Sequence, residues 1–286
     1  MSKNGKMSVH LECYPCFLRQ VVIASRLGTG DESVQRRVMQ EVISKLHRLD
    51  FSKTPAHTTT FIHREIRNIL GTDPFSEIKS RYNKIALGLY PRLKGIVRDS
   101  KDPLWTASRL AIAGNVIDFG IFSSIDIEGT IKRALDSPIE VDDYEAFRAE
   151  LQGAENILYL LDNTGEAVFD RILIEELLVL GKNVTAVAKG SPVINDCTTK
   201  DALEAGIPCQ IIDNGSDAVG TIIEMTSEGF RERLSTSDII ISKGQGNFET
   251  LLGQKENIYF FFQSKCIVVS EILGLSTGSM LLKKGG

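Results

Sequence analysis

The sequence lacks the features that mark several common classes of protein. Only five of its 286 residues are cysteine, an odd and sparse number that argues against a disulfide-stabilised scaffold. Its 33 basic residues are outnumbered by 37 acidic ones, so it has no basic excess with which to bind nucleic acid. No apolar run approaches the roughly 18 to 20 residues of a membrane span. The most apolar stretch, 258–275, carries Lys265 and Glu271.

What the chain does have is the composition of a globular protein. Hydrophobic residues make up 42% of it and charged residues 24%, which suffices for a large core and excludes wholesale disorder. Residues 1–8 are polar and weakly basic, without the apolar segment of a signal peptide. We therefore expect a soluble cytoplasmic protein with reduced thiols and with no membrane or nucleic-acid partner.

The first half of the chain, residues 1–152, has a helical pattern. Between Asp31 and Leu49, apolar residues recur every three or four positions and form one stripe of a helix, with Asp31 as its expected N-cap. Turn signals such as Tyr90-Pro91 separate the helical patterns. Further helices are predicted over 61–70, 75–93, 104–119, 129–135 and 144–151. We expect a mostly helical region that packs on the remainder of the chain.

The second half, residues 153–286, alternates short apolar runs with helical patterns. Such alternation is typical of parallel βαβ units in a sheet covered on both faces. Helices are predicted over 166–180 and 199–205, and strands over 156–161, 183–188, 208–212, 238–242, 258–262 and 266–270. The expected fold class is α/β, a three-layer α/β/α core with a mainly parallel sheet.

Three turns that follow predicted strands are unusually polar. They contain Asp162-Asn163-Thr164-Gly165-Glu166, with Asp170 one helical turn later, then 189–196 with Lys189 and Asp196, and 243–247 with Lys243, Gly244, Gly246 and Asn247. Ligands of open α/β sheets gather at the carboxyl ends of the strands, so these turns would converge on one edge. Oxygen ligands there suit Mg²⁺ or Mn²⁺, and lysines with helix N-termini suit a phosphate.

Each of these turns also has an ordinary structural explanation. Asp-Asn-Thr-Gly is a good turn and N-cap sequence, and Asp196 could simply cap the following helix. The glycines after Lys243 match only half of a dinucleotide-binding fingerprint. Because all three turns lie at strand ends, a site for phosphoryl chemistry is favoured over a purely structural role of these turns.

The histidines and the Cys13-x-x-Cys16 pair carry less information. None of the four histidines has a zinc-protease spacing, and no second Cys/His pair accompanies the two cysteines. Solvated or core roles are favoured for the histidines and packing for the cysteines, with a weak redox or metal site left open for the cysteines. Asn115 is an isolated polar residue in an apolar stretch, which indicates a buried polar contact.

Taken together, these segments resemble the metal-dependent damage-control phosphatase family, formerly a domain of unknown function, in its stand-alone archaeal and bacterial branch. The matching runs follow one another along nearly the whole chain: 13–16, 73–75, 113–118, 162–170, 189–196 and 243–249. The resemblance implies an α/β/α core with a helical N-terminal part. It also implies hydrolysis of small phosphomonoesters, sugar phosphates and damaged metabolites among them.

The resemblance implies a set of site residues as well. Asp162, Asn163 and Asp196 would hold a divalent cation, Mg²⁺, Mn²⁺ or another transition metal such as Co²⁺ or Ni²⁺. Lys243 would face the phosphate, and Glu166 and Asn115 would line the same pocket. Further expected contacts are Asp170 as a base or supporting carboxylate, and Lys189, Gly244, Gly246 and Asn247 around the substrate.

Three alternatives remain open at this stage. Asp162 could be a nucleophile rather than a ligand, although Thr164 stands where the haloacid-dehalogenase pattern needs a second Asp, which favours metal-activated water. A carboxyl methyltransferase using S-adenosylmethionine would need a glycine-rich loop, and only Gly165 follows the first strand of the second half. A non-catalytic metal- or metabolite-binding module would bind ligand without turnover.

Overall fold

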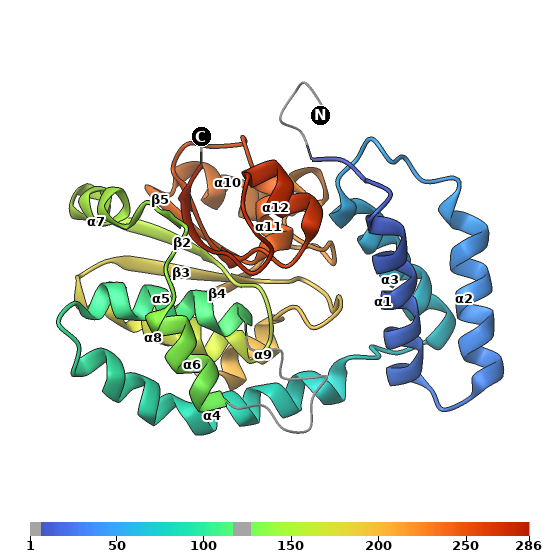
Figure 1. Ribbon diagram of the computed structural model, residues 1–286, viewed down its shortest axis with the longest axis horizontal. Helices are drawn as coiled ribbons and strands as arrows, with labels where there is room; N and C mark the ends of the chain where they lie inside the picture. Colours follow the sequence, from blue (N-terminus) through green and yellow to red (C-terminus); the bar gives the residue numbers. More distant parts are fainter. Residues whose placement is uncertain (1–6, 117–126, 286) are drawn as a thin grey trace.

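A computed structural model describes residues 7–116 and 127–285. Helices and strands form three layers, with one sheet in the middle (Figure 1). The helices are α1 (Cys13–Gly28), α2 (Glu32–Leu46), α3 (Pro55–Leu70), α4 (Ser76–Arg98), α5 (Pro103–Val116), α6 (Ile127–Asp136), α7 (Tyr144–Gly153), α8 (Glu166–Val179), α9 (Thr199–Glu204), α10 (Glu228–Thr236), α11 (Gln245–Leu251) and α12 (Ile267–Leu273). The strands are β1 (Val141–Asp142), β2 (Asn156–Leu160), β3 (Asn183–Ala188), β4 (Gln210–Asp213), β5 (Ile239–Lys243), β6 (Ile258–Gln263) and β7 (Met280–Lys284). A short 3-10 turn spans Ile223–Met225.

The sheet of the described residues has seven strands in the order β1-β7-β6-β5-β2-β3-β4. Its pairs are parallel except for β6 with β7. The central strands are continuous apolar runs because helices cover both of their faces. The α/β class and the mainly parallel sheet predicted from the sequence are confirmed.

Each face of the sheet has its own apolar core. Side chains of α4, α5, α7 and α8 pack on one face, against Tyr159 and Ile241 among others. Side chains of α10, α11 and α12 pack on the other face, against Leu160 and Phe260. A third cluster joins α1, α2 and α3, which lie together beside the sheet (Figure 1). Our division at residues 152 and 153 stays a prediction.

Two sequence-based predictions are wrong. The sequence predicts a strand over 266–270, but Cys266 is the N-cap of α12 and 267–270 belong to that helix, which is followed by Gly274 in a left-handed conformation. A short apolar run has no decisive periodicity, and the glycine after it was the stop signal to use. The sequence predicts a turn at Tyr90-Pro91, but Pro91 lies inside α4, where Leu93 and Val97 are buried in the core. Tertiary packing there outweighs the cost of the proline.

Other local predictions are confirmed. The Asp31 side chain accepts hydrogen bonds from the backbone of Ser33 and Val34, so it caps α2. Strand β3 has the predicted bounds. Strand β7, which lies between β1 and β6, was missed because only three of its five residues are apolar. None of the helices in the described ranges is long and apolar enough to cross a bilayer.

Candidate functional site

Three polar turns meet at the carboxyl ends of neighbouring strands. Strand β2 lies between β3 and β5, and Leu160 is in register with Val187 on one side and Ser242 on the other. The turns after β2 and β3 are also joined to each other. The Cys197 backbone N–H donates to the Asp162 carbonyl at 2.7 Å, and Asn163 forms a β-bridge with Asp196. The convergence predicted from the sequence is therefore present.

Gly244 brings the third turn against the first. It has φ +78° and ψ 159°, a conformation that is essentially restricted to glycine. A Cβ atom at this position would overlap the Asp162 carboxylate. The backbone of the β5 turn therefore passes directly beside Asp162.

Buried carboxylates and a carboxamide make up the centre of the site. The Asn163 Nδ2 group donates to Asp162 Oδ2 at 2.6 Å and to Glu166 Oε2 at 3.1 Å. Burial raises the pKa of Asp162 well above its usual range, and the charges of Glu166 and Asp196 raise it further. Burial likewise raises the pKa of Asp196, although Lys189 acts against it. The cluster thus gathers carboxyl groups away from water, where the charged form of each is disfavoured.

This chemistry fits a hard divalent cation. Carboxylate and carboxamide oxygens are its preferred ligands, and a cation would offset both the burial and the repulsion that raise the pKa of Asp162. Asp162, Asn163 and Asp196 supply two carboxylates and one carboxamide. Within residues 7–116 and 127–285, no group of three or more His, Cys, Asp or Glu side chains has the arrangement of a metal site. A cation at this place would therefore depend on the Asn163 oxygen and on water as well.

Lys243 is buried next to this cluster, and its ammonium group donates to three protein acceptors. The Lys243 Nζ atom is 2.6 Å from Glu166 Oε1, 2.6 Å from Asp170 Oδ1 and 2.8 Å from the Ala111 carbonyl. Its side chain is 0% exposed. Burial lowers its pKa, but the charges of Asp170 and Glu166 outweigh this, so the pKa lies above the usual value. An ammonium has three donors, and all three have protein acceptors.

Asp170 lies deeper than Glu166. Its Oδ1 atom accepts from Lys243 and from the Tyr159 hydroxyl, at 2.8 Å, whereas its buried Oδ2 atom has no partner among the described residues. Burial raises the pKa of Asp170. The sequence placed both carboxylates on one helix face, and the structure gives Glu166 the position nearer to Asp162.

Lys189 resembles Lys243 in being enclosed. Its ammonium is 3.4 Å from Asp196 Oδ2 and donates to the carbonyls of Ala218, at 2.9 Å, and Gly220. It therefore neutralises and holds Asp196 rather than extending into solvent.

Helix α4 supplies two residues that the sequence analysis missed. Lys79 forms an ion pair with Asp201 at 2.8 Å and reaches the Asp196 carbonyl at 3.4 Å. The Asn83 Oδ1 atom accepts from the Gly165 backbone N–H at 2.9 Å. A four-residue spacing of polar residues on a helix was the available signal, but it is common on solvated faces as well.

Lys265 is a third residue that the sequence analysis missed. It follows β6, its side chain is exposed, and its charge partly opposes the rise in the pKa of Asp162. No ion pair of Lys265 is present among the described residues. Its position after an apolar run was the signal that could have identified it, because neighbouring strand ends converge.

The remaining predicted residues have different surroundings. Asn247 is buried, with its Nδ2 atom donating to the Lys243 carbonyl and its Oδ1 atom accepting from Thr221, both at 2.8 Å. Gly246 lies against Gly220. Asn115 belongs to α5, but its side chain lies outside the described part of the structure. Cys13 is buried in the cluster of α1, α2 and α3, and Cys16 is exposed.

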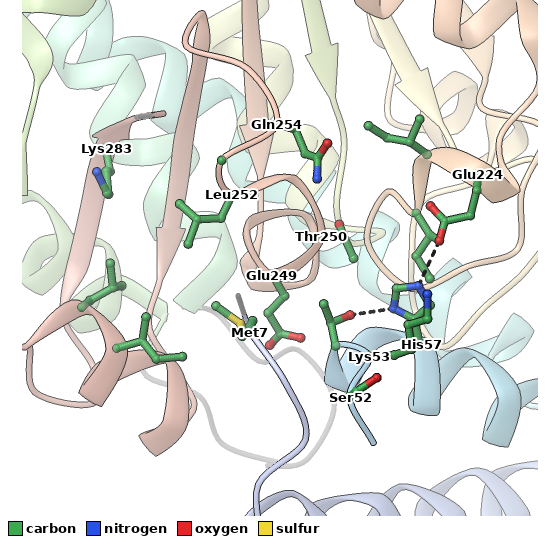
Figure 2. A pocket seen from close by; sticks show the side chains of 16 residues that line it. Met7, Ser52, Lys53, His57, Glu224, Glu249, Thr250, Leu252, Gln254 and Lys283 are labelled. Carbon is green, nitrogen blue, oxygen red and sulfur yellow. Dashed lines mark hydrogen bonds and ion pairs between the residues drawn. The ribbon is translucent and has the colours of Figure 1, made fainter. Parts of the chain in front are cut away.

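A cavity of about 760 Å³ is lined in part by Glu249 and Thr250 of α11 and by Leu252 and Gln254 after it (Figure 2). Glu249, His57 and Lys283 are among its lining residues, whereas Asp162, Asp196 and Lys243 are not. The cluster of carboxylates at the strand ends and this cavity are therefore separate features.

Comparison with known proteins identifies the family. The damage-control phosphatase ARMT1-like domain matches residues 9–281. The chain belongs to this family. An uncharacterized protein of Methanocaldococcus jannaschii is 36% identical, covering 96% of this chain and 94% of its own. A damage-control phosphatase of Archaeoglobus fulgidus is 33% identical, covering 97% and 99%.

A solved structure agrees with these sequence relationships. The crystal structure of a DUF89-family protein from Pyrococcus horikoshii superposes with a TM-score of 0.91 at 33% identity. The match covers 98% of this chain and 100% of that one. The resemblance inferred from the sequence motifs is confirmed, and membership of the damage-control phosphatase family supports a phosphatase role.

Proposed function

We propose that the protein is a divalent-metal-dependent phosphatase that hydrolyses small phosphomonoesters, sugar phosphates or damaged metabolites among them. The observation that carries this proposal is the meeting of Asp162, Asn163 and Asp196 at the ends of β2 and β3, beside the turn after β5. Family membership supports the phosphatase part, and the donor chemistry supports the cation. The net charge of −4 agrees with a small-molecule substrate rather than a nucleic acid.

Asp162, Asn163 and Asp196 would hold the cation. Bound there, it would neutralise developing charge on phosphate oxygens and lower the pKa of a coordinated water. Mg²⁺ and Mn²⁺ are the first candidates, with Co²⁺ and Ni²⁺ as further ones. We favour water over Asp162 as the nucleophile, because Thr164 stands in the place of a second Asp and is itself buried.

The other side chains of the site divide into two groups. Glu166, held by Lys243 and Asn163, is the carboxylate that we assign to orient or deprotonate the attacking water. Lys243 and Asp170 fix Glu166 from behind, and Lys189 fixes Asp196. Such supporting contacts commonly matter by about 10- to 100-fold in metal affinity or activity.

We assign the phosphate contact to Lys265 rather than to Lys243. Every donor of the Lys243 ammonium has a buried acceptor, whereas Lys265 is exposed at the next strand end and acts electrostatically on Asp162. A lysine in this position supplies a point charge to a phosphate. Cytoplasmic location and the absence of membrane or nucleic-acid partners remain part of the proposal.

The test is phosphate release from a panel of sugar phosphates and other phosphomonoesters by protein stripped of metal with a chelator. Turnover should be absent in the stripped protein and return with Mn²⁺ or Mg²⁺. The Asp162→Asn and Asp196→Asn variants should stay inactive at the same metal concentration. Turnover that survives stripping would exclude the cation, and methyl transfer from S-adenosylmethionine without phosphate release would favour the methyltransferase alternative.

A further inference from the structure

Two side chains of α11 connect Lys265 with the first turn of α3. The Lys265 backbone N–H donates to Gln245 Oε1 at 3.0 Å, and Gln245 Nε2 donates to Glu249 Oε1 at 2.9 Å. The Ala56 backbone N–H also acts on the Glu249 carboxyl and opposes the rise in its pKa that burial causes. The chain of contacts therefore runs from the loop after β6, along one face of α11, to the start of α3.

The orientation of the Gln245 amide follows from its partners. A backbone N–H can only donate, so Gln245 Oε1 faces Lys265, and a carboxylate oxygen accepts, so Gln245 Nε2 faces Glu249. The two side chains are four residues apart and share one face of the helix. No other orientation of the amide satisfies both neighbours.

This contact matters because Lys265 itself is exposed. A free lysine side chain samples many rotamers, and ordering it on a phosphate costs conformational entropy. Its Cα position is set by its own amide and by the preceding residue, whose backbone N–H donates to the Ser279 carbonyl at 2.9 Å. Helix α11 starts directly after Gly244, which lies against Asp162. Helix α11 therefore contacts both the carboxylate cluster, through Gly244 before its first residue, and the loop of Lys265, through Gln245.

We propose that Gln245 is a positioning residue for the reaction, which holds the Lys265 backbone at the distance from Asp162 that phosphate binding requires. Glu249 holds the Gln245 amide in turn. The proposal rests on the proposed function, since it assigns Gln245 to the same site.

The variants separate this contact from its surroundings. Gln245→Met keeps the length of the side chain and removes both hydrogen bonds. Lys265→Gln removes the charge on which Gln245 is proposed to act. Gln254→Met is the matched control, because Gln254 lines the same cavity as Glu249 (Figure 2) but takes no part in the chain of contacts.

Steady-state kinetics with Mn²⁺ and a sugar phosphate give the first readout. We expect Gln245→Met to raise KM by about tenfold with kcat within about twofold, as for loss of binding shared by ground and transition states. Gln254→Met should leave both values unchanged. In the Lys265→Gln background, Gln245→Met should add little further. Independent effects of the two substitutions would overturn the proposal, because a general structural role predicts additivity.

Amide hydrogen exchange at Lys265 gives a readout that needs no substrate. Exchange at this position should be faster in Gln245→Met than in the wild type and in Gln254→Met. Unchanged exchange would refute the positioning role even if the enzyme is active. Faster exchange in a protein without any phosphatase activity would instead count against the proposed function alone.

Discussion

At the scale of single residues, the site separates lysines that neutralise carboxylates from a lysine that remains available. Lys243, Lys189 and Lys79 are all buried, and each lies against acidic side chains. The sequence identified Lys243 and Lys189 as members of the site because they follow strands. Their roles could not be predicted, because the partners of Lys243 lie on α5 and α8 and two of those of Lys189 are the carbonyls of Ala218 and Gly220, all distant in sequence.

Substitution of a buried, paired lysine should reduce stability, whereas substitution of the exposed Lys265 should weaken substrate binding. Lys243→Met leaves Glu166 and Asp170 buried without their counter-ion, so we expect the free energy of unfolding to fall by about 3–5 kcal/mol. Lys265→Gln should barely change stability but should raise KM by about tenfold. Urea denaturation and steady-state kinetics measure the two effects. A stable Lys243→Met protein with a raised KM would reverse our assignment of the phosphate contact.

His63 provides a test of burial in the helical part. Burial lowers its pKa from 6.5 to about 3, and its Nε2 atom lies 3.1 Å from Gln20 Oε1. Because the folded-state pKa is depressed, the unfolded chain binds this proton first, and its contribution to stability is lost as pH falls below 6.5. From pH 7.5 to pH 5 the loss should be about 2 kcal/mol.

The comparison that isolates this effect is urea denaturation of wild type and His63→Gln at both pH values. The difference between their free energies of unfolding should shrink at the lower pH by roughly the stated amount. His47→Gln, at an exposed position, serves as the control. A pH-independent difference between wild type and His63→Gln would show that His63 is not held neutral.

At the scale of elements, the turns after the strands carry the site, and they were also the part of the fold that the sequence predicted best. Continuous apolar runs marked β3 with its observed bounds and β2 and β5 with errors of one residue at their ends, and the polar residues after them marked the turns. What could not be predicted was the long-range pairing: β1 and β7 join the sheet from distant parts of the chain. The helix α12 was mistaken for a strand because seven residues offer too little periodicity.

The turn after β5 is the element whose backbone can be tested most directly. Gly244→Ala should strain the turn and press against Asp162, lowering the free energy of unfolding by about 1–3 kcal/mol and Mn²⁺ affinity by at least about tenfold. Gly253→Ala is a matched control, because Gly253 also has a positive φ, +74°, but nothing lies within 4 Å of its added Cβ. Calorimetric titration of both variants with Mn²⁺ measures the two affinities. Equal losses of Mn²⁺ affinity in the two variants would mean that the contact of Gly244 with Asp162 does not contribute to Mn²⁺ binding.

At the scale of the whole molecule, the helices α1, α2 and α3 are tied to the sheet layer beside the site. Arg64 and Arg67 of α3 both form ion pairs with Asp217, and the Val219 backbone N–H donates to Thr60 of α3 at 2.9 Å. The carbonyls on either side of Val219 are those that hold Lys189, and Lys189 holds Asp196. The family resemblance indicated that the helical part belongs with the site, but these contacts join residues about 150 positions apart and have no local signal.

Cation binding should therefore stabilise the whole fold. A ligand that binds only the native state at 100 times its Kd adds about 2.7 kcal/mol to the free energy of unfolding. Mn²⁺ should raise the urea midpoint of the wild type and have no effect on Asp196→Asn. An equal rise in both proteins would place Mn²⁺ binding elsewhere.

The central claim is that Asp162, Asn163 and Asp196 together bind the cation on which turnover depends. It is tested most directly by the anomalous difference density of a crystal grown with Mn²⁺. We predict a Mn²⁺ peak in contact with oxygens of all three side chains, on the side of the cluster that faces Lys265. A peak bound at any other cluster, or no peak in crystals of protein that is active with Mn²⁺, would contradict the account.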